Sequence, residues 1–367
     1  MKQDWEKKKL GECFRLKSGE TLTRNKMEEG IIPVFGGNGI AGYHSKFNLS
    51  GNNVVIGRVG AFCGKARHIK ENIWLTDNAF QVVDFRVEFD LAFLNYLLNF
   101  YNLRQYARQA AQPVISNSSL RDIILSFPKS ILEQKRIAVI LDEISDSIAK
   151  AKANAEQNLK NARELFESYL QSVFANKGEG WEVTKLKEVC EYDKNQNSHK
   201  NLPYVGLEHI ESNSGTFLGS YEPQEVKSAT FQFNEQHVLY GRLRPYLNKV
   251  LLPNFKGHCS TEIFPIKVRK QIIRDFLFYW LIAGTTVKKI DATWTGARMP
   301  RANMNQVLEF DFAFPSINEQ VSIVSKLKVF ENEIHRLEAI YKKKIDNLEE
   351  LKRSILQNAF NGELKTA

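Results

Sequence analysis

The chain has 367 residues and a net charge of +9, from 51 lysines and arginines against 42 aspartates and glutamates. With 43% hydrophobic residues it can bury two cores, and no signal peptide or apolar run of transmembrane length is visible, so we expect a soluble intracellular protein. The four cysteines are far apart and form no Cys-x-x-Cys pair, which argues against a zinc site or a disulfide framework; they are Cys13, Cys63, Cys190 and Cys259.

The first 128 residues have the mixed pattern of an α/β globular domain. Residues 53–56 form a short apolar run between turn residues, which predicts a strand. Residues 91–112 have helical apolar spacing with aromatic side chains, which predicts a helix. We therefore expect a domain over 1–128, without assigning its strand order.

Residues 129–176 predict a long helix. From Ile137 onward, apolar or small residues recur in alternating steps of three and four, with an extra step of four from 155 to 159. Such steps are typical of a coiled-coil seam, and an extra step of four residues locally unwinds the coiled coil. A helix of some 40 residues spans about 60 Å, so it overshoots its own domain and needs a partner. The interface positions are Ile137, Leu141, Ile144, Ile148, Leu159 and Phe166.

Residues 177–315 predict a second α/β domain and 316–362 a second long helix, with a short tail at 363–367. In this domain 236–240 predicts a strand and 272–283 a helix. The second seam is broken only by Lys352, and its interface positions are Ile323, Leu327, Phe330, Ile334, Leu337, Leu348 and Ile355. With a domain between them, the two helices can pair as an antiparallel coiled coil; pairing with another chain is the alternative.

The second half of the chain repeats the first. Phe127-Pro128 followed by Glu133-Gln134 returns as Phe314-Pro315 followed by Glu319-Gln320, and the Leu-Gln-x-x-Phe of 170–174 returns at 356–360. The offset is 186 both from Glu133 to Glu319 and from Phe174 to Phe360. Equal spacing without insertions is expected of a long helix. Blocks around Arg58 and Arg242 match at an offset of 184, whereas the stretches between the blocks differ. One duplicated scaffold therefore carries two different surfaces.

The excess of positive charge lies on the two domains. Residues 1–128 hold 17 basic and 12 acidic residues and residues 181–315 hold 17 and 14, whereas 129–180 hold 8 and 8 and 316–367 hold 9 and 8. Basic modules on a neutral spacer are what a DNA-binding protein would show.

No motif supports catalysis. Residues 60–66 approach a phosphate-binding loop, but the segment is one residue short and Ala66 stands where a magnesium-binding serine or threonine belongs. Cys63 lies near His68 in sequence without a recognisable orienting acid, so a buried thiol is the simpler interpretation. Adenine-methyltransferase and nuclease motifs are absent.

Taken together, these motifs resemble the specificity subunit of a type I restriction–modification enzyme over essentially the whole chain. The resemblance rests on the twin helix entries and exits, on 36–43 (GGNGIAGY), 57–60 (GRVG) and 75–80 (LTDNAF), and on 296–301 (GARMPR). It implies that each domain reads one half of a bipartite, asymmetric DNA site and that the helices set the spacer between the halves.

The resemblance also implies partners. The helices would dock two methyltransferase subunits, which bind S-adenosylmethionine and methylate adenine; restriction subunits would add an ATP- and magnesium-dependent nuclease and translocase. The chain itself would be non-catalytic, without cofactor or metal, and would act in the cytoplasm of a bacterium or archaeon, away from membranes.

Candidate DNA contacts are basic, amide and hydroxyl side chains near the matched blocks, because such groups hold phosphates and read base edges. In the first domain they are His44, Ser45, Arg58, Lys65, Arg67, Asn78, Ser116 and Asn117. In the second they are Arg242, Arg244, Lys249, Arg298, Arg301, Asn303 and Asn305.

The repeat sorts some of these candidates. An arginine stands at this position in both repeats, as Arg58 and Arg242. A role in the scaffold or in binding phosphate therefore explains it as well as contact with a base. Arg244, Arg298 and Arg301 align with Gly60, Ala111 and Val114, which favours sequence-specific roles. Asn78 aligns with Glu262, a change that suits the reading of different bases or mere surface drift.

Two other functions remain open at this stage. The chain could be a two-domain scaffold that binds RNA or another protein and is unrelated to DNA modification. A stand-alone enzyme is the third hypothesis, and it has no motif behind it.

Overall fold

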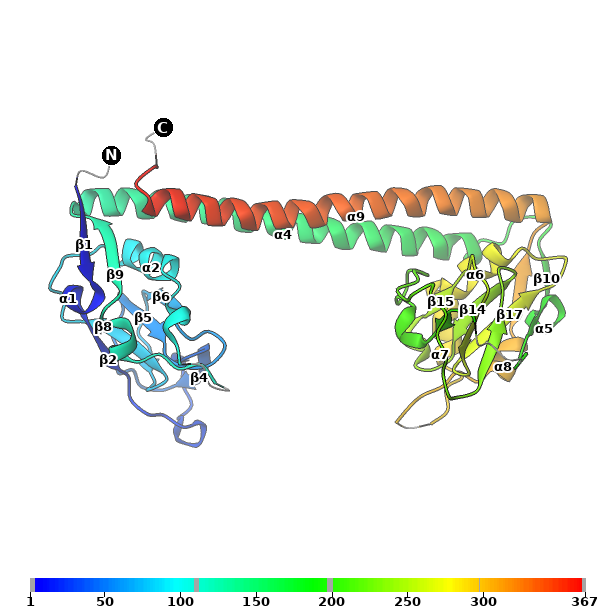
Figure 1. The fold of residues 1–367 in the computed structure, drawn as a ribbon, viewed down its shortest axis with the longest axis horizontal. Helices are drawn as coiled ribbons and strands as arrows, with labels where there is room; N and C mark the ends of the chain where they lie inside the picture. The colour runs from blue at the N-terminus through cyan, green and yellow to red at the C-terminus, as the bar shows by residue number, and fades with distance from the viewer. Residues whose placement is uncertain (1–3, 109–111, 197–200, 297, 365–367) are drawn as a thin grey trace. The chain divides into compact units, whose positions relative to one another are not determined.

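The computed structural model of the protein describes residues 4–108, 112–196, 201–296 and 298–364. The chain divides into two compact units, unit 1 (Met1–Ala155 with Lys343–Ala367) and unit 2 (Glu156–Lys342). Each unit therefore holds one globular part and portions of both long helices, α4 (Ile131–Ala175) and α9 (Ile317–Phe360) (Figure 1). The end of the predicted tail, 365–367, lies outside the described residues.

The globular part of unit 1 mixes short strands and helices. Its strands are β1 (Trp5–Lys9), β2 (Arg15–Ser18), β3 (Ile32–Gly36), β4 (Gly39–His44), β5 (Asn53–Gly57), β6 (Ala66–Ile69), β7 (Trp74–Leu75), β8 (Ala79–Val83) and β9 (Ile124–Pro128). Its helices are α1 (Leu10–Cys13), α2 (Leu91–Phe100) and α3 (Asn117–Leu120), with 3-10 turns η1 (Arg24–Lys26) and η2 (Leu103–Tyr106).

The globular part of unit 2 has a similar inventory. Its strands are β10 (Glu182–Lys185), β11 (Cys190–Tyr192), β12 (Tyr204–Val205), β13 (Thr230–Phe233), β14 (His237–Gly241), β15 (Val250–Leu251), β16 (Gly257–Ser260), β17 (Ile263–Val268) and β18 (Asp311–Phe314). Its helices are α5 (Leu186–Val189), α6 (Arg274–Ile282), α7 (Gly284–Asp291) and α8 (Met304–Leu308), with 3-10 turns η3 (Leu207–His209) and η4 (Pro245–Leu247).

The same antiparallel sheet lies at the centre of both units. Its strand order is β2-β8-β5-β6 in unit 1 and β11-β17-β14-β15 in unit 2. Strand β5 is buried on both faces, because Val54 and Ile56 belong to the main core with α2 whereas Val55 belongs to a smaller second core. Strand β14 divides its side chains between two cores in the same way. The predicted strands at 53–56 and 236–240, and the predicted repeat, are confirmed.

The two units differ in their small three-stranded sheet. In unit 1 the central strand is β3, which pairs with β4 in a hairpin and with β7 in parallel. In unit 2 the central strand is β16, which pairs with β12 in parallel and with β13 in antiparallel fashion. Both sheets therefore keep one parallel pair, β3 with β7 and β12 with β16, but the third strand is added beside β3 in unit 1 and beside β16 in unit 2.

The helix predicted over 91–112 is shorter in the structure. It begins after Asp90, whose side chain accepts a hydrogen bond from the Phe93 N–H, and ends at Phe100. Asn102 then adopts a left-handed backbone (φ 44°), which a continuing helix cannot accommodate, and η2 follows. Residues 109–111 lie outside the described residues. The apolar spacing continued past Phe100 because η2 also faces the core.

The repeated Phe-Pro…Gln motif anchors each long helix to a globular part. Gln134 is fully buried; its amide accepts a hydrogen bond from the Asp90 N–H (2.9 Å) and donates one to the Pro128 carbonyl (3.0 Å). Gln320 does the same with the Ile273 N–H (3.0 Å) and the Pro315 carbonyl (2.9 Å). A buried amide that satisfies two backbone groups explains why this residue returns in both halves.

The repeated Phe at the other end of each helix is a core residue. In unit 1 the ring of Phe360, near the end of α9, packs on Phe93 and Phe100 with centroids 5.6 and 4.8 Å away. In unit 2 the ring of Phe174, near the end of α4, packs 5.3 Å from that of Phe276. Within each unit the start of one long helix thus meets the end of the other, so the helices pair antiparallel, as predicted.

Contacts between α4 and α9 occur within both units. In unit 1 Lys152 forms an ion pair with Glu349 (2.5 Å), and in unit 2 Arg163 forms one with Glu338 (2.5 Å). Such partly exposed pairs each contribute less than about 1 kcal/mol, so apolar burial must stabilise the pairing.

The predicted seam positions serve more than one purpose. Ile137 and Leu141 lie in the main core of unit 1 and Leu327 in that of unit 2, while Ile148 and Ile334 are buried along the helices. Phe166 and Phe330 contact each other at 6.1 Å, whereas Leu337 is 38% exposed. Ile144, Leu159, Ile323, Leu348 and Ile355 are half-buried. The complete helix-pair assignment stays a prediction.

All four cysteines are free and buried, and none of the described helices is long and apolar enough to cross a membrane. Burial raises the pKa of Cys13 to about 11 and that of Cys190 to about 12, and it also raises the pKa of Cys63 and Cys259. Because the fold favours the protonated thiol, this contribution to stability is complete below pH 9 and is lost as the pH rises towards 11.

We therefore expect these thiols to be unreactive in the folded chain. A thiol-specific disulfide reagent at pH 8 should titrate fewer than about one thiol per chain, because reaction requires an accessible thiolate. All four should react after denaturation in guanidinium chloride. Rapid reaction of two or more thiols in the native chain would contradict their burial.

Candidate nucleic-acid interface

Three separate segments of unit 2 meet around Arg242, directly after strand β14. The Arg242 N–H donates to the Glu262 carbonyl (2.9 Å) and the Ala302 N–H donates to the Arg242 carbonyl (2.9 Å). Two residues on, the Arg244 N–H donates to the Pro300 carbonyl (2.7 Å). The predicted contacts Arg242, Arg244 and Arg301 are thus brought together by backbone hydrogen bonds.

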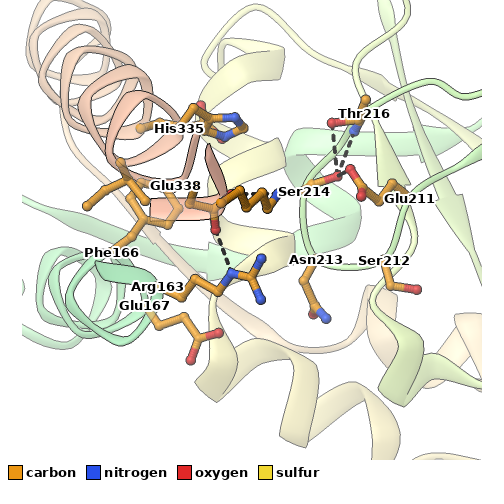
Figure 2. A pocket seen from close by; sticks show the side chains of 13 residues that line it. Arg163, Phe166, Glu167, Glu211, Ser212, Asn213, Ser214, Thr216, His335 and Glu338 are labelled. Carbon is orange, nitrogen blue, oxygen red and sulfur yellow. Dashed lines mark hydrogen bonds and ion pairs between the residues drawn. The ribbon is translucent and has the colours of Figure 1, made fainter. Parts of the chain in front are cut away.

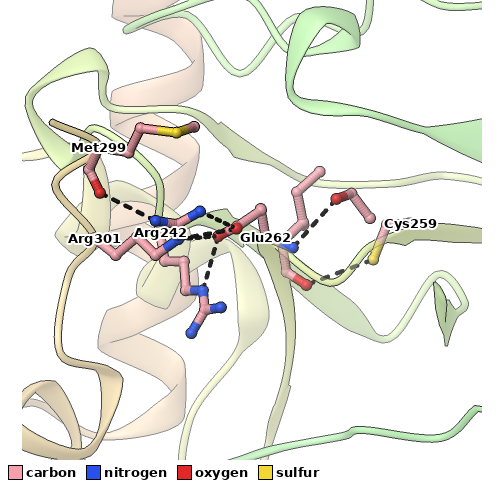
Figure 3. A network of polar contacts seen from close by, with 7 residues as sticks. Arg242, Cys259, Glu262, Met299 and Arg301 are labelled. Carbon is pink, nitrogen blue, oxygen red and sulfur yellow. Dashed lines mark hydrogen bonds and ion pairs between the residues drawn. The ribbon is translucent and has the colours of Figure 1, made fainter. Parts of the chain in front are cut away.

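The carboxylate of Glu262 holds two of these arginines (Figure 3). It accepts hydrogen bonds from Nε of Arg242 (3.0 Å) and from Nε and Nη2 of Arg301 (2.9 and 2.8 Å). Arg301 also donates through Nη1 to the Met299 carbonyl (3.1 Å). Burial alone would raise the pKa of Glu262, but the two guanidinium groups outweigh it and lower the pKa, so the carboxylate stays ionised. The cluster keeps one net positive charge.

Unit 1 builds the same site with different side chains. The Arg58 N–H donates to the Asn78 carbonyl (2.9 Å), the Ile115 N–H to the Arg58 carbonyl (3.0 Å) and the Gly60 N–H to the Pro113 carbonyl (3.2 Å). These bonds match those of unit 2, so the alignment of Asn78 with Glu262 and of Val114 with Arg301 holds in three dimensions.

The shared arginine of each site is stacked on a core phenylalanine. The guanidinium of Arg58 lies 5.4 Å from the ring centre of Phe80, and that of Arg242 lies 5.3 Å from Phe264. Without a carboxylate beside it, Arg58 reaches only the Asp77 carbonyl (3.4 Å), and its buried Nε has no hydrogen-bond partner among the described residues. Stacking on a core ring gives Arg58 and Arg242 a physical reason for a scaffold role. The polar groups around the two arginines differ between the units.

The glycine-rich segment of unit 1 packs against this site. A Cβ at Gly37 would lie 2.4 Å from the Val59 carbonyl oxygen, which only glycine avoids. Asn38 accepts a hydrogen bond from the Phe62 N–H (3.2 Å). Asn38 and Phe62 thus join the candidate surface, although neither was among the predicted contacts; the glycines flanking Asn38 were the available signal.

Several predicted contacts form hydrogen bonds within their own domain. His44 is only 3% exposed and its Nδ1 accepts a hydrogen bond from the Glu28 N–H (2.9 Å). The Ser45 hydroxyl donates to the Glu28 carboxylate (2.6 Å). Lys249 donates to the carbonyls of Leu207 and Ile210, both at 2.7 Å. In these positions polar side chains satisfy groups of their own domain.

Three further candidates are bonded to nearby backbone. Ser116 caps α3 by accepting from the Ser119 N–H (3.2 Å), and Asn303 caps α8 by accepting from the Gln306 N–H (3.3 Å). Asn117 donates to the Leu16 carbonyl (3.0 Å). Ser and Asn directly before the first residue of a helix are common N-cap signals, which could have identified the two caps from the sequence.

The remaining candidates are at least partly exposed. Asn78, Arg244, Arg298 and Asn305 are exposed, and Arg67 is half-buried beside the Phe62 ring (5.6 Å). The ammonium of Lys65 has no hydrogen bond or ion pair within the described part of the chain. Burial, reinforced by the charges of Lys352 and Arg67, lowers the pKa of Lys65. A cation without an anion beside it is suited to binding phosphate.

A separate polar pocket of about 540 Å³ lies in unit 2 between both long helices and the loop 211–216 (Figure 2). It combines acidic side chains with Arg163, His335 and Lys342. The hydrogen bond from Ser214 lowers the pKa of Glu211. Among the described residues no group of three or more His, Cys, Asp or Glu side chains could hold a metal ion. None of the predicted DNA contacts lines this pocket.

Comparison with known proteins gives a consistent result at the level of sequence. The family model of the type I restriction modification DNA specificity domain matches residues 2–160 and 178–347. The chain is 24% identical to the type I restriction enzyme EcoDI specificity subunit of Escherichia coli, over 98% of this chain and 89% of that subunit. It is 33% identical to the EcoprrI specificity subunit of Escherichia coli, over 43% of this chain and 42% of that subunit.

Solved structures share the fold. A chain from a structure concerning the assembly and conformational transition of the type I R-M system matches with a TM-score of 0.79 at 15% identity, over 99% of both chains. The HsdS subunit from Thermoanaerobacter tengcongensis matches with a TM-score of 0.59 at 16% identity, over 99% of this chain and 98% of that one. The arrangement of two α/β domains in tandem, each followed by a long helix, is thus known among solved proteins.

Proposed function

This chain belongs to the family of type I restriction–modification DNA specificity subunits, and we propose from this that unit 1 and unit 2 each read one half of a bipartite DNA site. The family match covers both halves of the chain, which disfavours a scaffold unrelated to DNA modification. As a specificity subunit, the chain would select the site on which other subunits act.

One observation carries the proposal. Backbone hydrogen bonds build the same site in both units, but Asn78 and Val114 stand in unit 1 where Glu262 and Arg301 stand in unit 2. To read two different base sequences, two domains of one fold need the same backbone arrangement but different hydrogen-bonding side chains. An asymmetric target follows from this difference.

The charges of the sites favour DNA as the ligand. Residues 1–128 have a net charge of +5, from 17 basic and 12 acidic residues, and Lys65 offers a cation without an anionic partner in the described chain. Phosphate contacts of this kind would position the duplex, and binding would weaken as salt concentration rises.

We assign the spacer and the docking of partners to the long helices. They have nearly equal lengths, 45 and 44 residues, which suits a constant spacer between variable half-sites. Leu132, Val139 and Val329 are 79%, 54% and 64% exposed on them, and such apolar side chains favour contact with two methyltransferase subunits. Restriction and translocation subunits would join the same assembly, in the cytoplasm.

The cofactors of the reaction are assigned to the partner subunits: S-adenosylmethionine for methylation, and ATP with magnesium for restriction. The segment of this chain closest to a phosphate loop uses its glycines for packing. Gly64 has φ 82° and a Cβ there would lie 2.4 Å from the Arg104 backbone nitrogen. These glycines are accounted for without a bound nucleotide.

The experiment that tests this function is a methylome of the source cell with the gene intact and deleted. Deletion should remove one gapped adenine-methylation motif completely, because no other chain would direct the methyltransferase to that DNA site. The surviving and lost motifs would also reveal both half-sites and the spacer. An unchanged methylome, in a cell where the intact gene and its methyltransferase genes are expressed, would contradict the proposal.

A further inference from the structure

The backbone of Arg244 is strained, and none of the contacts recorded for the described residues explains why. Its φ is 52°, and the matching position of unit 1 is Gly60, with φ 84°. Asn248 (φ 46°) and Gly64 (φ 82°) form a second matching pair. The duplicated scaffold therefore requires a left-handed backbone at both positions, which glycine adopts freely and a side chain adopts only at a cost.

Asn248 has a structural reason to replace glycine. Its side chain is only 4% exposed and donates to the Ile282 carbonyl (3.2 Å), and asparagine is among the residues that tolerate this conformation best. The Asn248 carbonyl also accepts a hydrogen bond from the Asn213 N–H (3.1 Å). Only the side-chain bond to Ile282 depends on asparagine, and it ties the loop to the end of α6.

Arg244 lacks such a reason. Its backbone N–H bonds to the Pro300 carbonyl, an interaction that glycine would make equally well. Its side chain is exposed, and no acceptor in the described part of the chain takes a hydrogen bond from its guanidinium. A strained backbone conformation that no stabilising interaction offsets is typical of functional positions.

The neighbours of Arg244 show what its side chain adds. Arg242 and Arg301 are already engaged by Glu262, so they form the fixed part of the site. Arg244 is joined to the same segment through its backbone bond to Pro300, and its guanidinium donates no hydrogen bond to any of the described residues. Unit 1 has no side chain at this position, so the two units differ here in the group that they offer to a ligand.

We propose that Arg244 determines the specificity of unit 2 by reading a guanine in the half-site that this unit contacts. The inference rests on the proposed function and deepens it. A guanidinium donates two parallel hydrogen bonds to O6 and N7 of guanine in the major groove, the pairing that arginine makes most often with a base. Gly60 gives unit 1 no such reader at the corresponding position.

The test compares three variants of the full chain by Tm and by the methylome of a cell that carries each variant. Arg244→Gly should raise the Tm by about 2–4 °C, because strain is removed. It should also lower methylation of the native site relative to sites altered at one guanine by roughly 5- to 100-fold. Arg244→Lys keeps charge and strain but not the paired donors, so it too should lose the guanine preference. Asn248→Gly is the matched control and should leave the motif unchanged.

Each other outcome overturns the inference. An unchanged motif with Arg244→Gly would remove Arg244 from specificity, and a lowered Tm would show that it stabilises the loop. Retained guanine preference with Arg244→Lys would make the residue a phosphate contact. These failures would occur while the wild-type gene still produced a gapped motif, whereas failure of the proposed function is the absence of that motif in the wild type.

Discussion

Replacing Gln320 by alanine should lower the free energy of unfolding of unit 2 by about 2–5 kcal/mol, the largest stability effect that we expect from one substitution. The side chain is fully buried, and it satisfies the Ile273 N–H together with the carbonyls of Pro315 and Gln271. Alanine would leave these backbone groups without a partner and would also leave a cavity. Each unsatisfied buried group costs about 1–3 kcal/mol.

The corresponding change in unit 1 offers an internal repeat of the experiment. Gln134→Ala removes the partner of the Asp90 N–H and of the Pro128 carbonyl, so unit 1 should be destabilised to a similar extent. Lys135→Ala and Ser322→Ala are matched controls, because both residues are exposed on the same helices. Calorimetry of the full chain should show a loss of roughly 5–15 °C in the Tm of the affected unit. Losses below about 1 kcal/mol would mean that water replaces the amide.

Arg301→Ala should weaken recognition of the half-site read by unit 2 and leave the other half-site unchanged. The substitution removes a guanidinium that Glu262 holds in place, and it leaves that carboxylate with Arg242 alone. The local net charge then falls from +1 to zero. Loss of one well-placed arginine costs about 1–3 kcal/mol, so methylation efficiency at the native site should fall roughly 5- to 100-fold.

The second half-site is the control within the same experiment. Methylome sequencing of the variant should show a relaxed motif on one side of the spacer only. Arg298→Ala, an exposed residue of the same loop, is expected to act in the same direction more weakly, because no carboxylate fixes it. Equal losses at both half-sites, or no loss at either, would remove Arg301 from the recognition surface.

Much of the architecture could be predicted from the sequence, because its determinants are local or repeated. Steps of three and four predicted the long helices. The equal offsets from Glu133 to Glu319 and from Phe174 to Phe360 predicted that both helices have one length. The alignment of Asn78 with Glu262 was also predicted, since duplicated scaffolds keep their spacing. The helix predicted over 91–112 is confirmed over 91–100 but was predicted too long, because the left-handed backbone of Asn102 prevents its continuation. Apolar periodicity does not report a single dihedral angle.

The DNA contacts stay a prediction, because the polarity of a side chain does not distinguish a ligand-binding group from a helix cap. His44, Ser116 and Asn303 have the side chains expected of DNA contacts, but each is committed to a backbone N–H of its own domain. Lys249 resembles Lys65 in the repeat, yet its ammonium is held by two carbonyls. These commitments depend on which segments fold next to one another.

By itself, the sequence determined the duplicated plan of this protein: two α/β domains, two helices of matched length, and a surplus of positive charge on the domains. Such features follow from periodicity, spacing and composition, which can be read along the sequence without knowledge of tertiary contacts. Only the tertiary structure decided that Glu262 holds Arg242 and Arg301 while the guanidinium of Arg244 stays open on a strained backbone. The strength and direction of a hydrogen bond depend on distances of a few ångströms between segments far apart in the chain, and these distances are set by the packed core.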